Sequence, residues 1–128
     1  MDEEFEITYS WDDDILFIVI SGMTTKENAN IISGKVRKIY SQEKPEKVLV
    51  DCVNLDGRLR TADTYVHVRD HVREYLQEKG HRPEKVAILD RPENEEDFSF
   101  YSVTAQNVGL RPKFFVAFDA AVTWLQGE

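Results

Sequence analysis

The densest group of potential metal ligands follows one face of a predicted helix. His67 and His71 are four residues apart, and Asp63 and Glu74 project in nearly the same direction. This face lies opposite the apolar stripe of the helix, and the sequence lacks the glutamate that follows the first histidine of a His-Glu-x-x-His metalloprotease. We therefore interpret these four residues as a solvated helix face and predict that the protein holds no metal.

Residues suited to nucleophilic chemistry occur singly. Asp51 ends a predicted buried strand, where aspartyl phosphotransferases place a nucleophile, but Val53 replaces the second aspartate of an Asp-x-Asp pair. Cys52 has an acidic neighbour and no histidine close in sequence, so nothing activates its thiol. No Gly-x-Ser-x-Gly elbow and no glycine-rich phosphate loop is present. We predict no catalytic residue, and we expect Asp51 to brace the following loop and Cys52 to pack in the core.

Cationic side chains gather near one predicted loop of this acidic protein. The segment from Asp56 to Thr61 is polar, contains a glycine and precedes a helix, as recognition loops often do. Four arginines are expected near this side of the molecule: Arg58, Arg60, Arg69 and Arg91. They can receive an anion, although pairing with the abundant carboxylates is the more ordinary interpretation.

Hydrophobic patterning predicts the elements that position these residues. Phe5, Ile7 and Tyr9 alternate with polar residues, and an acidic corner then leads into an uninterrupted apolar run at 15–20. The two segments predict a hairpin whose second strand is central and covered on both faces.

Helices and strands then alternate to the end of the chain. Thr24 and Glu27 have the spacing of a capping box, which predicts a helix start, and Asp119 is the expected cap of the last helix. Further strands are predicted at 47–52, 86–89 and 114–118, with helical periodicity between them. Four strand residues are expected in the core: Ile18, Val50, Ile88 and Val116.

The resulting order, ββαβαβαβα, predicts an α/β fold. We expect a five-stranded, mixed and mostly parallel sheet with about four helices, and the first strand antiparallel at or near an edge. Sites in open α/β sheets gather beyond the carboxyl ends of the strands. Here this rim comprises residues 21–25, 54–64, 90–94 and Asp119.

The whole pattern resembles the STAS-like domain of anti-sigma-factor antagonists and sulfate-transporter tails, especially its divergent SpoIIAA-like branch. The resemblance rests on the opening hairpin, the strand that ends in Asp51, the strand at 86–89, and the closing segment 118–125 with its aromatic-Leu ending. It covers nearly the whole chain. It implies one STAS-like domain over residues 1–128, acting as a non-enzymatic regulatory or protein-interaction module.

The resemblance also singles out Thr61. In the antagonists a serine after an Asp-Ser-Ser-Gly turn is phosphorylated and controls partner binding, and that turn falls here on residues 59–62, where the aspartate and glycine are missing. Thr61 is therefore a candidate for phosphorylation, with helix capping as the more ordinary role. The candidate binding surface comprises Asp56, Arg58, Arg60, Thr61 and Thr64.

The resemblance also allows a second function. The SpoIIAA-like branch is also compared with lipid-carrying Sec14-type domains, so the alternative is a small-molecule or lipid-binding domain that holds a small apolar ligand. Such a role needs an apolar pocket. No residue in the sequence distinguishes a pocket lining from ordinary aromatic core packing.

Composition limits the classes of partner. The 24 acidic and 16 basic residues give a net charge of −8, which repels nucleic acid and anionic lipid. The single cysteine excludes an intrachain disulfide, and neither a signal peptide nor an apolar stretch of membrane-spanning length is present. We expect a cytoplasmic protein without a cofactor, whose partner is an unidentified protein.

Overall fold

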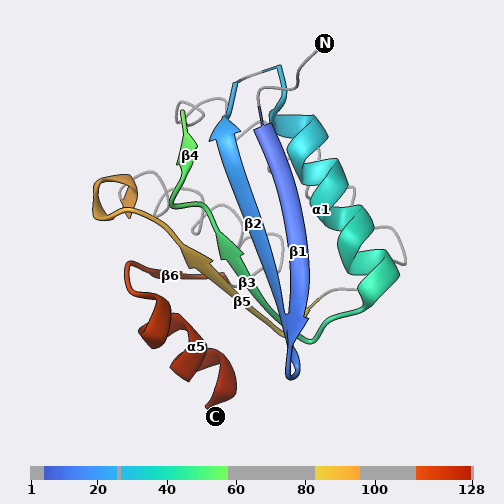
Figure 1. Ribbon diagram of the computed structural model, residues 1–128, viewed down its shortest axis with the longest axis vertical. Coiled ribbons are helices and arrows are strands. Elements are labelled where there is room, and N and C mark those ends of the chain that lie inside the picture. The colour runs from blue at the N-terminus through green and yellow to red at the C-terminus, as the bar shows by residue number, and fades with distance from the viewer. Residues whose placement is uncertain (1–4, 26, 58–82, 96–111, 128) are drawn as a thin grey trace.

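The computed structural model describes residues 5–25, 27–57, 83–95 and 112–127. A mixed six-stranded sheet forms its centre, in the order β1-β2-β3-β5-β6 with β4 paired to β2 (Figure 1). The strands are β1 (Phe5–Asp12), β2 (Ile15–Met23), β3 (Lys47–Asp51), β4 (Leu55–Asp56), β5 (Lys85–Leu89) and β6 (Lys113–Phe115). The helices are α1 (Ala29–Glu43), the 3-10 turn η2 (Pro92–Asn94) and α5 (Phe118–Gln126).

The first two strands form the predicted hairpin. β1 pairs with β2 in antiparallel register from Phe5–Gly22 to Asp12–Ile15, and β1 is the outermost strand in the order. Asp13 takes a φ of 56° at the first position of the two-residue connection, as the turns favoured in tight hairpins require. All other pairings are parallel. The mixed, mostly parallel α/β sheet with an antiparallel edge strand is therefore confirmed.

The acidic corner of the hairpin is tied to β3. Lys47 Nζ lies 3.1 Å from Asp14 Oδ2, and this hydrogen bond lowers the pKa of the exposed Asp14 carboxyl. The side chain of Asp14 is 67% exposed, so solvent screens the pair and its contribution to stability is small.

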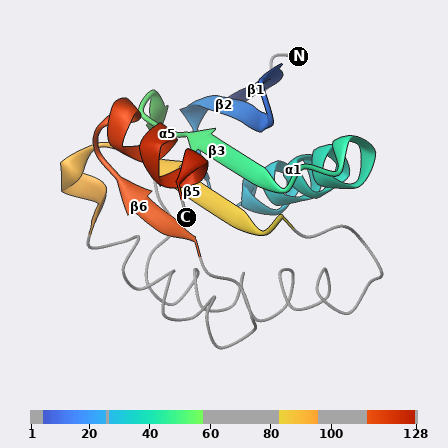
Figure 2. The same ribbon diagram turned by 90° about the horizontal axis from the view of Figure 1, so that it is seen from below.

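Helices cover the two faces of the sheet. Side chains alternate along β3, so Val48 and Val50 pack in the cluster beneath α1, while Leu49 packs with Ala121 and Leu125 of α5 on the opposite face. Figure 2 shows the two helices on either side of the sheet. The strand residues between the helices are buried because each face has its own apolar cover.

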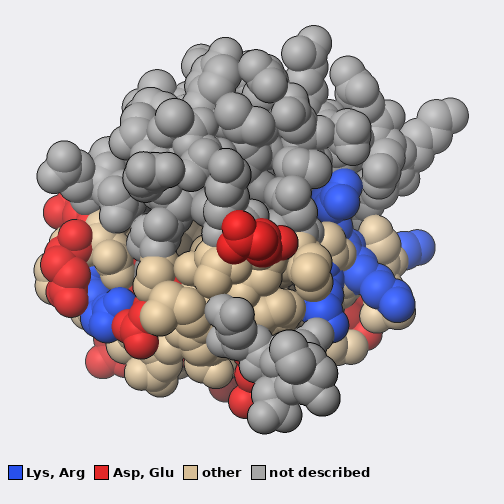
Figure 3. All heavy atoms as spheres, turned by 90° about the horizontal axis from the view of Figure 1, so that it is seen from above, with Lys and Arg blue, Asp and Glu red and all other residues tan. Residues whose placement is uncertain are grey.

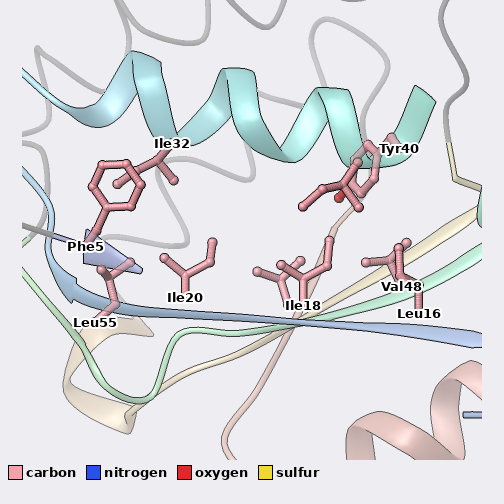
Figure 4. Packing of buried hydrophobic residues seen from close by; sticks show 10 residues of the cluster. Phe5, Leu16, Ile18, Ile20, Ile32, Tyr40, Val48 and Leu55 are labelled. Carbon is pink, nitrogen blue, oxygen red and sulfur yellow. The ribbon is translucent and has the colours of Figure 1, made fainter. Parts of the chain in front are cut away.

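The larger cluster lies between α1 and the first three strands. Leu16, Ile18 and Val48 are fully buried there, and Figure 4 shows them pointing toward Ile32 and Tyr40 of the helix. Burying a side chain of this size contributes about 1.5–3 kcal/mol. This cluster therefore holds the hairpin and β3 against α1.

The number of strands differs from the prediction. The sheet has six strands rather than five, because Leu55 and Asp56 form β4 beside Gly22 and Met23 of β2. This segment was predicted to be a loop, because two residues are too few to show the alternating pattern of a strand. Of the roughly four predicted helices, the described residues contain α1 and α5. The other two fall on 58–82 and 96–111, which lie outside the described residues.

The end of the sheet also differs from the prediction. The last strand covers Lys113–Phe115 rather than 114–118, and Val116, expected in the core, is 56% exposed. Ile18 and Val50 are buried, and Ile88 is partly buried against the larger cluster. The aromatic run misled the prediction because its last residues begin α5 instead of extending the strand.

Neither predicted helix cap is the observed N-cap, which is Asn28 for α1 and Ala117 for α5. The Thr25 Oγ1 accepts a hydrogen bond from the Asn28 N–H at 3.0 Å, and Asn28 Oδ1 accepts one from the Thr25 N–H at 2.7 Å. This reciprocal pair lies one residue beyond the predicted Thr24 and Glu27 box and forms the turn before α1, whose N-cap is Asn28 with no side-chain capping bond. In α5 the N-cap is Ala117, and Asp119 lies in the first turn.

One part of β2 is open to solvent. Ile15, Leu16, Ile18 and Ile20 are buried as predicted for a central strand, but Val19 is 38% exposed. Val19 faces the side of the sheet on which α5 lies, and α5 packs over β3, β5 and β6 rather than over this end of β2. The expectation that both faces of the strand are fully covered is therefore wrong at Val19.

Candidate functional site

The carboxyl ends of the parallel strands form a continuous hydrogen-bonded rim. The N–H of Cys52 donates to the carbonyl of Leu89 at 2.8 Å, and the N–H of Asp90 donates to the carbonyl of Phe115 at 3.0 Å. These bonds extend the ladders past the last paired residues of β3 and β5. Backbone hydrogen bonds alone therefore hold the chain beyond these strands in place.

A tight turn connects β3 to β4. Asp51 Oδ1 accepts a hydrogen bond from the Val53 N–H at 3.0 Å, and the Leu55 N–H donates to the Cys52 carbonyl at 3.0 Å. The first contact is the local turn that aspartate side chains favour. It confirms that Asp51 braces the loop. Cys52 is partly buried against the larger cluster, as expected of a residue that packs in the core.

The connection after β4 lies against the end of β2. The N–H of Gly22 donates to the Asn54 carbonyl at 3.2 Å, and the N–H of Thr24 donates to the Asp56 carbonyl at 2.7 Å. Gly57 follows with a φ of 74°. The chain thus leaves the described part of the rim at Gly57 in a defined direction.

Asp90 organises the turn after β5. It is 6% exposed, and its Oδ1 accepts hydrogen bonds from the Arg91 N–H at 2.7 Å and from Asn94 Nδ2 at 3.0 Å. A buried carboxylate oxygen is satisfied by such donors. The Asp90 side chain therefore holds the turn that contains η2.

Arg91 connects the turn after β5 to β4. Its Nη2 donates to the Leu55 carbonyl at 3.3 Å and lies 3.1 Å from Asp56 Oδ1, and its Nε is 3.8 Å from Glu93 Oε2. The Asp56 side chain is 60% exposed, so the ion pair contributes little to stability. For Arg91, pairing with carboxylates is confirmed as the correct interpretation.

One exposed apolar side chain, Met23, lies beside this ion pair because its register partner in β4 is Asp56, and two others follow β6. Met23 ends β2 at 43% exposure, Val116 follows β6 at 56%, and Phe118 begins α5 at 50%. The Phe118 ring stacks on Phe17 with the centroids 5.9 Å apart, so part of it is held in place. Figure 3 shows the molecule from above the view of Figure 1, with neutral residues among separate acidic and basic groups.

The predicted binding residues divide into two sets. Asp56 belongs to β4 and pairs with Arg91, whereas Arg58, Arg60, Thr61 and Thr64 lie outside the described residues, as do the histidines of the predicted helix face. Neither the role of Asp90 in its turn nor the exposure of these apolar residues was predicted from the sequence. The four-residue spacing of Asp90 and Asn94 after a strand was the available signal for the former.

Two further findings apply to the described ranges. Within them, no three histidine, cysteine, aspartate or glutamate side chains come together in a way that could hold a metal ion. No helix in the same ranges has the length and hydrophobicity to cross a membrane.

Comparisons with known proteins place the fold. No family model and no curated protein sequence matches the chain. An anti-sigma factor antagonist from Mycobacterium paratuberculosis is similar in structure with a TM-score of 0.66 at 10% identity, covering 96% of this chain and 95% of that one. A protein of the DUF3478 family with a SpoIIAA-like fold, from Shewanella loihica PV-4, has a TM-score of 0.57 at 22% identity, with 98% of each chain covered. The chain therefore has the SpoIIAA-like α/β fold.

Proposed function

We propose that this chain is a non-enzymatic regulatory module that binds a protein partner through the rim at the carboxyl ends of its strands. The observation that carries the proposal is the exposure of Met23, the register partner of Asp56 at the Asp56–Arg91 ion pair, together with the exposure of Val116 and Phe118 after β6. Aromatic residues, methionine and arginine are enriched where proteins bind one another. The backbone beneath them is fixed by hydrogen bonds, so little order is lost on binding.

The similar structure from Mycobacterium paratuberculosis supports the same class of function, because that protein is an anti-sigma factor antagonist. A net charge of −8 argues against a nucleic acid or an anionic membrane as the partner. We further propose a cytoplasmic setting, which suits a chain with a single cysteine.

The proposed contact surface continues from Asp56 into the segment that follows Gly57. Arg58 and Arg60 are proposed to meet a carboxylate or phosphate of the partner, with Thr64 at the same surface. Thr61 is proposed as a site at which phosphorylation alters binding, because the fold should tolerate added negative charge near the start of the helix that the sequence predicts there.

The experiment compares purified baits in a native lysate, with captured proteins quantified by mass spectrometry. The baits are the wild type, the double variant Arg58→Ala with Arg60→Ala, and Thr61→Glu. Loss of a charge-assisted contact should weaken capture of the partner by roughly ten- to a hundredfold, while the thermal unfolding curve of each bait stays close to that of the wild type.

The outcomes distinguish a protein-interaction module from a ligand-binding domain. Identical protein profiles from all three baits would remove this segment from the functional surface. Native mass spectrometry of the purified chain provides the second readout. A retained small apolar ligand, together with no captured protein, would replace the interaction module with the ligand-binding alternative.

A further inference from the structure

The outer edge of β1 has no partner strand among the described residues. β1 pairs only with β2 in the sheet order, and Figure 2 shows it at one margin of the sheet, with α1 and α5 on the two faces. Its side chains from Thr8 to Asp12 are exposed, including Tyr9 at 42% and Trp11 at 45%. Such an edge is a template for another strand.

The hairpin register shows which backbone groups face outward. Asp12 and Ile15 close a two-residue connection and so form a hydrogen-bonded pair, after which bonded and non-bonded pairs alternate. At the other end the Gly22 N–H donates to Asn54 and not to β1, as the alternation requires. The N–H and C=O groups that face away from β2 therefore belong to Phe5, Ile7, Tyr9 and Trp11.

A second copy of β1 matches this edge in one antiparallel register. A two-fold axis through Thr8 sets outward-facing residues of one copy opposite outward-facing residues of the other. Phe5 then pairs with Trp11 and Ile7 pairs with Tyr9, and each of these pairs occurs twice. This gives about eight main-chain hydrogen bonds. Aromatic pairs and aromatic–β-branched pairs are the favourable cross-strand contacts in sheets. They would also cover the two exposed aromatic side chains of β1.

The charges agree with this register. Glu6 faces Ser10 across the axis, so no like charges are opposed between residues 5 and 11, whereas an axis through Tyr9 would set Glu6 against Asp12 within β1. With the axis at Thr8, Asp12 falls opposite Glu4, which precedes β1. Lys35 Nζ lies 5.9 Å from the centroid of the Phe5 ring, and Trp11 donates to Glu43 Oε1 at 2.7 Å. Pairing Phe5 with Trp11 of the second copy therefore brings Lys35 of one copy and Glu43 of the other to the same end of the paired strands.

Three of the features by which proteins block strand addition are missing from β1, which carries the charged residues Glu6 and Asp12. β1 contains no proline and no lysine, and its register with β2 runs without a bulge from residue 5 to residue 12. From these observations we infer that the chain forms a symmetric dimer by antiparallel pairing of β1 with β1 of a second copy, centred on Thr8. This surface is distinct from the rim proposed to bind a protein partner.

Sedimentation velocity of the full chain, from low concentration to about 100 µM, tests the dimer because association follows mass action. The wild type should sediment with the mass of two chains. Thr8→Lys places two like charges on the axis and should raise the dimer dissociation constant by about tenfold or more, as should Thr8→Glu. An equal mixture of the two variants should restore a dimer, since the opposed charges then attract.

Two further variants separate pairing from folding. Tyr9→Pro removes an outward N–H and leaves the bonds to β2 intact, so it should yield a folded monomer by circular dichroism. Thr123→Lys makes the same charge change on exposed α5 and should remain a dimer. A wild type that stays monomeric throughout, or a dimer that both Thr8 variants and Tyr9→Pro leave unchanged, would overturn the inference.

Discussion

Gly57 shows how one residue sets the direction in which the chain leaves the rim. Its φ is 74°, and a Cβ built there would meet the Thr24 carbonyl oxygen and would lie 2.7 Å from Met23 Sδ. Both the backbone conformation and the space exclude a side chain. The N–H of Thr24 donates to the carbonyl of the preceding Asp56, so this approach is part of the contact between β4 and β2.

We predict that Gly57→Ala lowers the free energy of unfolding by about 1–3 kcal/mol, because alanine is strained at positive φ and meets backbone atoms. Urea denaturation followed by circular dichroism measures the change. Gly34 is the matched control, since a Cβ there meets nothing within 4 Å and the residue lies inside α1. Gly34→Ala should stabilise by about 0.5–1 kcal/mol. Equal effects at both positions would contradict this account of Gly57.

At the residue scale, sequence reasoning succeeded where the contact is local. Asp51 was expected to brace its loop because aspartate commonly bonds to a backbone N–H two residues on, and it does so with Val53. The pairing of Arg91 with Asp56 joins residues that are 35 positions apart in the chain. Sequence alone offers no reason to select this carboxylate among the 24 acidic residues.

At the scale of elements, Lys85 ties the first residue of β5 to the end of α5. Its Nζ donates to the carbonyls of Trp124 at 3.2 Å and Gly127 at 3.0 Å, and it lies 5.2 Å from the centroid of the Trp124 ring. The last carbonyls of a helix lack partners within the helix, and a cation satisfies them favourably. This one side chain therefore helps to hold α5 on its face of the sheet.

Lys85→Met keeps the apolar stem and removes the charge, so we expect the free energy of unfolding to fall by about 1–2 kcal/mol. Lys38→Met is the control, because Lys38 is exposed on α1 and a surface change of this kind stays within about 0.5 kcal/mol. Thermal or urea unfolding of the three proteins provides the comparison. A loss at Lys85 no larger than that at Lys38 would show that the contact is not stabilising.

Periodicity predicted the long elements better than their ends. The hairpin, α1, β3 and β5 follow from alternation or helical spacing that extends over several residues. β4 was missed because Leu55 and Asp56 are strand residues only through their pairing with β2. α1 begins after the predicted Thr24 cap, because Thr25 and Asn28 form a reciprocally bonded turn and Asn28 is the N-cap.

At the scale of the whole molecule, the alternation of strands and helices predicted the mixed, mostly parallel α/β sheet. The family resemblance implied the SpoIIAA-like fold that the structural comparisons support. The apolar part of the rim was not predicted. An apolar residue at the end of a strand pattern has the same sequence signature whether the sheet covers it or leaves it exposed. Val116 was therefore assigned to the core, although it is 56% exposed.

The central claim is that this rim, and not exposed apolar surface in general, binds the partner. Val116 and Ile31 allow a direct test, because both are exposed β-branched residues, at 56% and 52%, on different parts of the molecule. Quantitative capture from native lysate would compare the wild type with Val116→Asp and Ile31→Asp, each checked for an unchanged unfolding temperature. The account predicts that Val116→Asp reduces capture of the partner by about tenfold or more, while Ile31→Asp leaves it unchanged. Equal capture by all three baits, or loss with Ile31→Asp alone, would contradict it.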